Sequence, residues 1–299
     1  MLKIGTRSSK LALTQTQIVI DLLKAVDPKL EFEVVPIVTT GDKLYDANLA
    51  LIGGKGLFLK ELEEHLLDGK IDFAVHSLKD VPAFLPDGLT ISCFLKRENP
   101  FDAFLSAKYR DLNSLPAGGK VGTSSSRRLV QLKALRPDLE IVPFRGNVIT
   151  RLNKLQDGVV DACILACAGL KRLGLEAEIK HILTPDQMLP AVGQGVICIE
   201  HMDNNKSLTD LLEQINHKPT EICAIAERAF MKELSGNCTT PLAAYAVIEG
   251  EMVNLNAMYC SDIKCEGIYV CSQSHISHSA LAGEECGIKI KSVIANLEP

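Results

Sequence analysis

Arginine is scarce in this chain and concentrated in one part of it. Ten of the 299 residues are arginines, and six of these lie within 127–172, although the formal net charge is -5. Arg127 and Arg128 directly follow a run of small residues, 121–126, at an expected helix start. Exposed N–H groups and the helix dipole favour an anion there, and a guanidinium binds a carboxylate through two parallel hydrogen bonds. The sequence therefore predicts a site for carboxylates or phosphates.

Adjacent arginines also need a counter-charge. Arg127 and Arg128 repel each other unless an anion lies between them, so the pair favours a bound ligand. Arg145 and Arg151 bracket a second expected helix start, 146–150. The alternative is an ordinary surface role, solvated or paired with a carboxylate, and it is favoured for the isolated arginines Arg136, Arg172 and Arg228.

A second candidate group follows a buried strand. The residues His76-Ser77-Leu78-Lys79-Asp80-Val81-Pro82 come directly after the apolar segment 71–75. Open α/β sheets bind ligands at the carboxyl ends of their strands, so an acid and a base at this edge indicate a reactive site. Alternatively, Asp80 is a turn residue before Pro82 and His76 is a hydrogen-bonded imidazole at the strand end. The residues alone leave both interpretations open.

A glycine-rich segment, Gly53-Gly54-Lys55-Gly56, carries one cation before an expected helix. It suits a lid or a nest of N–H groups around a phosphate. It lacks the spacing and the hydroxyl residue of a Walker loop, and no G-x-G-x-x-G, H-E-x-x-H or G-x-S-x-G motif occurs elsewhere. Nucleotide binding by these routes is therefore not expected.

Six of the ten cysteines lie from Cys223 onward. A zinc site is an alternative for the group Cys260, Cys265, Cys271, Cys286, His275 and His278. The absence of a C-x-x-C motif argues against it, and Cys265 and Cys271 share one strand face with Tyr269, as core residues would. Cys238 differs because it lies in a short polar turn, 235–241, where a thiol would be accessible.

The composition limits the class of protein. Hydrophobic residues make up 46% of the chain, enough for packed cores, whereas 37 acidic residues against 32 basic ones and the lack of tryptophan argue against a nucleic-acid surface. The longest apolar stretch, 162–170, is too short to span a bilayer, and residues 1–5 look like a first strand, without a signal-peptide hydrophobic region. A cytoplasmic location with reduced, mostly buried thiols is expected.

The order of expected elements predicts an α/β fold with mixed, mostly parallel sheets. In the first lobe, 1–96 and 196–214, strands are expected at 2–5, 32–38, 71–75, 89–95 and 196–199, and helices at 9–26, 57–67 and 207–216. The first helix would be capped by Ser8 or Ser9. In the second lobe, 101–190, strands are expected near 121 and at 140–144 and 162–165, with helices at 125–135 and 148–156.

A third and smaller domain, 218–299, is expected to be α+β. It would begin with a helix at 220–234, and its strands alternate at 243–248, 253–259 and 268–272. A charged break ending at Pro100 separates the first two lobes, and the segment 190–195 precedes the return of the chain to the first lobe.

Six segments together resemble the porphobilinogen deaminase family. They are Gly5-Thr6-Arg7-Ser8, Gly53-Gly54-Lys55-Gly56-Leu57-Phe58, His76-Ser77-Leu78-Lys79-Asp80-Val81-Pro82, Gly122-Thr123-Ser124-Ser125-Ser126-Arg127-Arg128, Arg145-Gly146-Asn147-Val148 and Leu189-Pro190-Ala191-Val192-Gly193-Gln194-Gly195. The resemblance runs from Leu2 to about Pro241 and fades beyond it. It implies two lobes similar to periplasmic binding proteins, followed by a C-terminal domain.

The resemblance also implies an activity. Enzymes of this family are cytoplasmic, usually monomeric transferases of tetrapyrrole (porphyrin and haem) biosynthesis that join four porphobilinogens head to tail, release ammonia and free hydroxymethylbilane by hydrolysis. It implies a dipyrromethane cofactor, built from the substrate and held by a thioether to a cysteine that corresponds to Cys238. No metal, nucleic acid or membrane is implied, and hand-over of the product to a downstream synthase is a further expectation.

Roles for individual residues follow from the same resemblance. The catalytic aspartate corresponds to Asp80, which would hold pyrrole N–H groups, assist the departure of ammonia and stabilise the cation that forms. Residues implied in cofactor binding are Cys238, Lys79, Arg127, Arg128, Arg145, Ser125 and Ser126. Residues implied in substrate binding are Arg7, Ser9, Lys55, Phe58, Ser77, Arg151 and Arg172. Because each pyrrole carries an acetate and a propionate, an arginine-lined cleft would explain the arginine cluster.

The chain departs from the family at one position. The family often has Gly-Gly-Cys before the proline-ended turn, whereas this chain has Gly236-Asn237-Cys238, and asparagine also tolerates a left-handed turn. Two other classes of protein stay open. One is a non-enzymatic two-lobed protein that binds carboxylates or oxyanions, and the more distant one is a zinc-binding regulatory protein.

Overall fold

The computed structural model describes residues 1–43, 59–236, 240–261 and 266–297. The chain divides into two units, Met1–Glu98 with Val196–Glu221 and Asn99–Gly195 with Ile222–Pro299. The chain therefore leaves the first unit after Glu98, returns to it at Val196 and leaves it again after Glu221. The candidate segment 76–82 therefore belongs to the first unit, whereas the arginine cluster, 127–172, belongs to the second.

The first unit contains a five-stranded sheet in the order β2-β1-β3-β10-β4. Its strands are β1 (Leu2–Arg7), β2 (Phe32–Ile37), β3 (Phe73–Ser77), β4 (Leu89–Phe94) and β10 (Ile197–Met202). β1 pairs in parallel with β2 and β3, and β10 pairs antiparallel with β3 and β4. Strands β1 and β3 therefore present their carboxyl ends at one edge of the sheet, which places Arg7 beside Ser77 and its neighbours.

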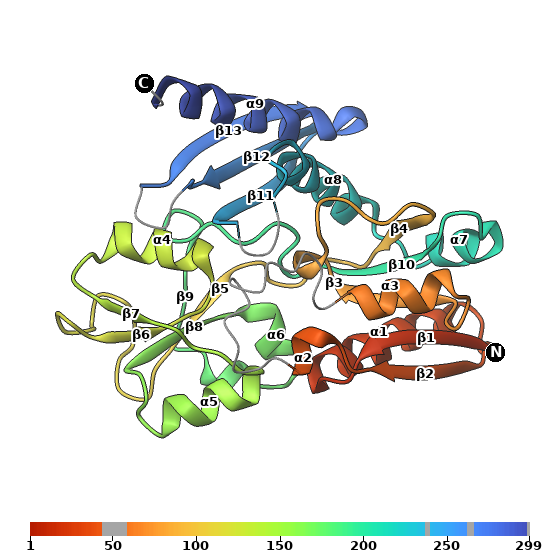
Figure 1. The fold of residues 1–299 in the computed structure, drawn as a ribbon, viewed down its shortest axis with the longest axis horizontal. Coiled ribbons are helices and arrows are strands. Elements are labelled where there is room, and N and C mark those ends of the chain that lie inside the picture. Colours follow the sequence, from red (N-terminus) through yellow and green to blue (C-terminus); the bar gives the residue numbers. More distant parts are fainter. Residues whose placement is uncertain (44–58, 237–239, 262–265, 298–299) are drawn as a thin grey trace. The chain divides into compact units, whose positions relative to one another are not determined.

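Helices cover both faces of this sheet (Figure 1). They are α1 (Lys10–Val26), α2 (Thr40–Lys43), α3 (Lys60–Leu67) and α7 (Lys206–Glu213). Side chains alternate along β3, so Phe73 and Val75 join the core formed with α1 and α7, whereas Ala74 packs with Leu62 and Leu66 of α3. His76 shares the α3 face with Ala74, which explains its burial.

The second unit contains another five-stranded sheet, in the order β7-β6-β8-β5-β9. Its strands are β5 (Asp102–Leu105), β6 (Lys120–Gly122), β7 (Glu140–Val142), β8 (Ala162–Ala166) and β9 (His181–Ile182). β6 is parallel to β7 and β8, and β5 is antiparallel to β8 and β9. Helix α4 (Ser126–Leu135) packs on one face, while α5 (Val148–Gln156) and α6 (Cys167–Arg172) share the core of the other.

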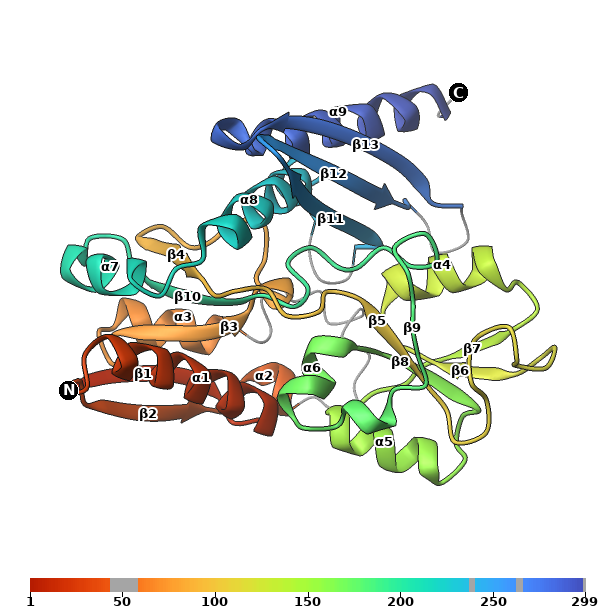
Figure 2. The same cartoon turned by 180° about the vertical axis from the view of Figure 1, so that it is seen from behind.

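A smaller sheet forms the C-terminal part of the second unit. The strands β11 (Leu242–Glu249), β12 (Met252–Tyr259) and β13 (Ile268–His275) run antiparallel in chain order. Helix α9 (Ala280–Leu297) lies along this sheet, as Figure 2 shows from behind. Helix α8 (Lys218–Glu233) spans the boundary between the units, and a Cβ atom on Gly283 of α9 would collide with its backbone. The absence of a side chain there lets α8 and α9 pack closely.

The structure confirms the predicted α/β class, the mixed sheets and the smaller C-terminal part, but parallel pairing does not predominate. Among the described strands, two of the four pairings in each five-stranded sheet are antiparallel, because β10 and β5 enter their sheets in the reverse direction. Helices α2, α6 and α9 and strands β5 and β9 were not predicted. The further division of the second unit into a middle lobe and a C-terminal domain stays a prediction.

Candidate functional site

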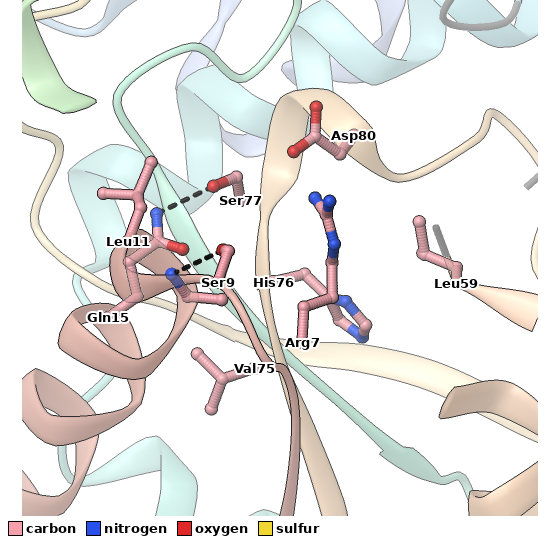
Figure 3. Close-up of a pocket in the computed structure, with 10 residues that line it drawn as sticks. Arg7, Ser9, Leu11, Gln15, Leu59, Val75, His76, Ser77 and Asp80 are labelled. Carbon is pink, nitrogen blue, oxygen red and sulfur yellow. Dashed lines mark hydrogen bonds between the residues drawn. The ribbon is translucent and has the colours of Figure 1, made fainter. Parts of the chain in front are cut away.

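A small pocket opens in the first unit at the carboxyl ends of β1 and β3 (Figure 3). It is lined by Arg7, Ser9, Leu11, Ala12, Gln15, Leu59, Val75, His76, Ser77 and Asp80. Two segments far apart in the sequence supply its polar side chains: the end of β1 with the first turns of α1, and the end of β3 with the turn that follows it. The pocket brings together four of the residues predicted for the site: Arg7, Ser9, Ser77 and Asp80.

Local structure holds these side chains in place. Ser9 caps α1, where its hydroxyl oxygen accepts the Ala12 N–H at 3.3 Å, so the predicted cap is confirmed. Gln15 Nε2 donates to Ser77 Oγ at 2.7 Å, which ties α1 to the end of β3. After Ser77 the chain forms one short 3-10 turn, Leu78–Asp80, and the Leu78 N–H donates to the carbonyl of Val196 at 3.0 Å.

Asp80 is the acid of this pocket. Its side chain is half-buried, and Figure 3 shows the Arg7 guanidinium directed towards the Asp80 carboxylate. A carboxylate can accept N–H groups of a ligand or stabilise a cation, while a guanidinium beside it can bind a carboxylate of the same ligand. Lys79 is also half-buried in the same turn. The pocket can therefore receive a molecule that carries both N–H donors and carboxylates.

His76, which lines this pocket, belongs to a buried acid–base pair. His76 Nε2 lies 3.0 Å from Glu200 Oε2, and the two side chains are 4% and 0% exposed. Glu63 of α3 lies close enough to interact with both. Burial, with the Glu200 charge as the next cause, raises the pKa of Glu63 to about 7. His76 is therefore an imidazole at a strand end that is paired with Glu200. This agrees with the structural interpretation of His76 given in the sequence analysis.

The arginine pair in the second unit is buried. Both arginines lie in the first turn of α4, which Ser125 caps by accepting the Arg128 N–H. Arg127 Nη2 lies 2.8 Å from Asp102 Oδ2, and Arg128 donates from Nε and Nη2 to Asp102 Oδ1 at 3.1 and 2.6 Å. The counter-charge that the sequence required between Arg127 and Arg128 is therefore supplied in part by Asp102 of β5.

This cluster shifts the pKa values of Asp102 and Arg127. Burial alone would raise the pKa of Asp102, but Arg127 and Arg128 hold it far below its ordinary range. Burial lowers the pKa of Arg127, and the Asp102 charge opposes that shift. Backbone carbonyls complete the cluster, since Arg127 Nη1 donates to Leu189 O at 2.5 Å and Arg128 Nη1 donates to Ile164 O at 2.9 Å. The Asp102 carboxylate is therefore ionised at neutral pH.

The other predicted residues of the second unit are less buried. The side chains of Ser125, Ser126, Arg145, Arg151 and Arg172 are partly exposed. Asn147 caps α5 by accepting the Thr150 N–H at 2.9 Å, so Arg145 and Arg151 flank a helix start as predicted. Arg172, in the last turn of α6, donates from Nη2 to the carbonyl of Gly195 at 2.7 Å. Arg145 and Arg151 therefore lie at the start of α5, and Arg172 lies at the end of α6.

Three predicted site residues, Lys55, Phe58 and Cys238, lie outside the described residues. Of the eight cysteines that are described, seven are buried and none is bonded to another, which agrees with the expected buried thiols. Cys271 is the exception. The strand pattern predicted that it is a core residue, but it is exposed. Within the described ranges, no group of three His, Cys, Asp or Glu residues could hold a metal ion.

Sequence reasoning missed several polar residues that shape these sites, including Gln15 of the pocket. Asp102 and Gln194 lie beside the arginine pair, where Gln194 Nε2 donates to Asp102 Oδ1 at 3.0 Å. Glu63 and Glu200 lie beside His76. Gln194 belongs to the segment 189–195, which the sequence analysis had singled out. No neighbouring residues in the sequence mark Asp102, Glu63 or Glu200 as site residues. Their partners are distant in the chain.

Taken by class, this is an α/β protein. Its first unit holds a pocket with a carboxylate and a guanidinium, which suits a ligand with N–H donors and carboxylates, and its second unit holds a buried guanidinium pair. Residues 2–210 match the family model described as porphobilinogen deaminase, dipyromethane cofactor binding domain, and residues 221–296 match the model of the porphobilinogen deaminase C-terminal domain. The chain belongs to the porphobilinogen deaminase family.

Curated relatives agree with this assignment. The chain is 48% identical over 260 residues to the porphobilinogen deaminase of Syntrophomonas wolfei, covering 87% of this chain and 85% of that protein. It is 51% identical over 251 residues to that of Nitratidesulfovibrio vulgaris strain DP4, covering 84% and 80%.

Solved structures similar to this chain include periplasmic proteins. A nutrient-binding protein from Burkholderia cenocepacia bound to methionine has 15% identity and a TM-score of 0.45, over 71% of this chain and 90% of that one. A periplasmic substrate-binding protein from Coxiella burnetii has 16% identity and a TM-score of 0.44, over 76% and 97%. In the parts of the chain that the structure describes, no helix is long and apolar enough to cross a membrane.

Proposed function

We propose that the protein joins four porphobilinogen molecules head to tail, with release of ammonia, and frees hydroxymethylbilane by hydrolysis. This is the activity of a hydroxymethylbilane synthase in tetrapyrrole biosynthesis. The observation that carries the proposal is the family match over 2–210 and 221–296, together with an aspartate in a pocket at the motif where the family has its catalytic aspartate.

The donor set of the second unit fits a dipyrromethane cofactor. A dipyrromethane made from porphobilinogen carries acetate and propionate groups, and the cluster at Arg127 and Arg128 has two guanidiniums for one internal carboxylate. Its carboxylates would be held by Arg127, Arg128, Arg145, Ser125 and Ser126 of this unit, and Cys238 would attach it as a thioether. Lys79, which belongs to the first unit, is a further proposed cofactor-binding residue. When bound, the cofactor supplies the pyrrole carbon to which the first substrate is joined.

The chain's own residues would bind the substrate and move its protons. Asp80 accepts pyrrole N–H groups of porphobilinogen, assists the departure of ammonia and stabilises the substrate cation that results. Arg7 lies in the same pocket and would bind a substrate carboxylate. Ser9, Lys55, Phe58, Ser77, Arg151 and Arg172 complete the proposed substrate-binding set. Gln15 keeps the Ser77 hydroxyl in place through its 2.7 Å hydrogen bond.

The proposal extends to the state and place of the protein. We place it in the cytoplasm, because seven of the eight described cysteines are buried and unbonded, as is usual where thiols stay reduced. We further propose that it acts as a monomer and passes its product to a downstream synthase.

The test is a reaction of the purified protein with porphobilinogen. The proposal expects porphobilinogen to be consumed, one ammonia to be released per molecule consumed, and a linear tetrapyrrole to be detected by mass. A non-enzymatic protein that binds carboxylates would instead retain porphobilinogen unchanged. Binding without release of ammonia would therefore favour that second class over the proposed enzyme.

A further inference from the structure

The cluster around Asp102 carries an uneven charge. It holds one carboxylate and two guanidiniums, and the side chains of Asp102, Arg127 and Arg128 are 0%, 4% and 8% exposed. Buried charges are normally paired, because an unpaired one loses its hydration without compensation. In the part of the chain that the structure describes, no second carboxylate pairs with either arginine. Among the described residues, one positive charge of the cluster is therefore left without a paired carboxylate.

Donors for an anion are also left over. A guanidinium has five N–H groups. The hydrogen bonds and ion pair described above use Nη1 and Nη2 of Arg127, and Nε, Nη1 and Nη2 of Arg128, once each. Both arginines therefore retain N–H groups beyond those that Asp102 and the two carbonyl oxygens engage. Asp102 therefore holds the two guanidiniums in place but does not use all of their N–H donors.

Asp102 is itself held firmly. It is the first residue of β5, and Gln194 donates to its Oδ1 atom at 3.0 Å and to the carbonyl of Pro100 at 2.6 Å. On the other side, Gln131 of α4 accepts the Leu189 N–H at 2.7 Å and donates to its carbonyl at 3.1 Å. The guanidiniums are thus fixed before any ligand arrives, which lowers the entropy lost on binding.

We propose that Asp102 is a positioning residue for loading of the cofactor: its two oxygens hold Arg127 and Arg128 together, and the positive charge left over attracts a carboxylate of the dipyrromethane. This inference rests on the proposed function, because the anion it names is the cofactor that the chain builds from porphobilinogen. Asp102 touches neither substrate nor cofactor in this account and acts only through the two arginines.

The test measures loading and not turnover. The wild-type chain and Asp102→Asn are produced as apoproteins in a host that cannot make porphobilinogen. Each is then incubated with porphobilinogen and denatured at intervals, and its intact mass is recorded. Asp102→Asn keeps the size of the side chain but removes the charge that gathers the guanidiniums, so we expect the adduct to form at least about tenfold more slowly.

A matched control lies in the same unit. Arg136 and Asp138 form a two-pronged pair, with Nε–Oδ1 and Nη2–Oδ2 distances both 2.7 Å, at a more exposed position. Asp138→Asn should load at the wild-type rate. If Asp102 were merely structural, Asp102→Asn would unfold more easily but would also load at the wild-type rate, and this result would overturn the proposal. Equal slowing in Asp138→Asn would overturn it too.

Asp102→Glu covers the case in which Asp102→Asn does not fold. Glutamate keeps the charge but extends it by one methylene group, which displaces the guanidiniums, so slow loading of a folded variant is again expected. Loading of Asp102→Glu at the wild-type rate would contradict a positioning role. Failure of the wild-type apoprotein to gain any mass would count against the proposed function itself, which distinguishes the two failures.

Discussion

The imidazole of His76 and the carboxylate of Glu200 form a pair with a 3.0 Å separation, 4% and 0% exposed, inside the first unit. Their strands run antiparallel, and Glu200 lies two residues along β10 from the residue opposite His76. The two side chains therefore share one face of the sheet, beneath α3. The pair secures the carboxyl end of β3, from which the turn bearing Asp80 starts.

Loss of the histidine should be costly. His76→Leu would leave the Glu200 carboxylate buried without its partner, so we expect the free energy of unfolding to fall by about 3–5 kcal/mol. Urea denaturation measures this change. The exposed pair of Lys60 and Glu64, 3.8 Å apart, supplies the control, and Glu64→Gln should change stability by less than about 1 kcal/mol. A His76→Leu variant as stable as wild type would contradict the assigned pairing.

Glu63 predicts a dependence of stability on pH. Its pKa is raised from 4.5 to about 7 in the folded protein, so the folded state binds more protons than the unfolded state between these values. Stability should therefore fall as the pH rises through this window, and the full loss should be present above about pH 7. Glu63→Gln should remove this contribution, and the variant should exceed wild type in stability at pH 8.

Urea unfolding at pH 5 and pH 8 separates this effect from others. Glu64→Gln, one residue further along α3 and exposed, should keep the wild-type pH dependence. If the free energy of unfolding changed equally between pH 5 and pH 8 in Glu63→Gln and in wild type, Glu63 would not titrate in this window.

Asp80→Asn tests the proposed acid of the pocket. The amide keeps the shape of the side chain but can neither take up a proton nor stabilise a cation, so turnover should fall by at least about 10²-fold. Asp80→Glu should be affected less. Asp87→Asn, at an exposed position in the same stretch of chain, serves as the control. A near-normal steady-state rate for Asp80→Asn would return Asp80 to a role in the turn alone.

Substitutions of the arginines of the second unit should impair different steps of the reaction. A hydrogen bond to a charged group contributes about 1.5–3 kcal/mol, so Arg→Ala at 127, 128, 145, 151 or 172 should weaken its own step about tenfold to a hundredfold. Some variants should lack the cofactor, and others should carry it and accumulate one or two further pyrroles after brief exposure to substrate. Native mass spectrometry distinguishes these outcomes.

Arg136→Ala is the control for that series. Arg136 donates to the carbonyl oxygens of Leu112 and Leu115 as well as to Asp138, so its removal should lower stability but leave the adduct mass unchanged. If all five variants at 127, 128, 145, 151 and 172 lost substrate affinity by the same factor and none changed its adduct mass, the result would contradict stepwise elongation.

Local features were predictable from the sequence. Ser9, Ser125 and Asn147 cap helices by accepting N–H groups three residues along the chain, so the signal and its partner lie within one turn. The turn after β3 followed equally from an apolar strand ahead of polar residues. The same turn marked Asp80 as a candidate at a strand end, whereas Arg7 and Ser77 were implied by the family resemblance.

Distant partners were not predictable. Asp102 lies 26 residues before Arg128, in a strand of four residues that follows a charged break, so no periodicity marked it. Glu200 meets His76 only because β10 returns antiparallel to β3. Helix α9 was missed since glycine costs a helix about 1 kcal/mol per residue, yet at Gly283 and Gly287 it permits close packing against α8. Tertiary contacts decided each case.

The intact mass of the purified, denatured protein tests the central claim most directly. A thioether survives denaturation whereas a bound ligand does not, so the account predicts an adduct about two pyrrole units heavier than the chain. It should map to the peptide that contains Cys238, and Cys238→Ser should lack it. An active enzyme whose Cys238 peptide has its unmodified mass would contradict the account.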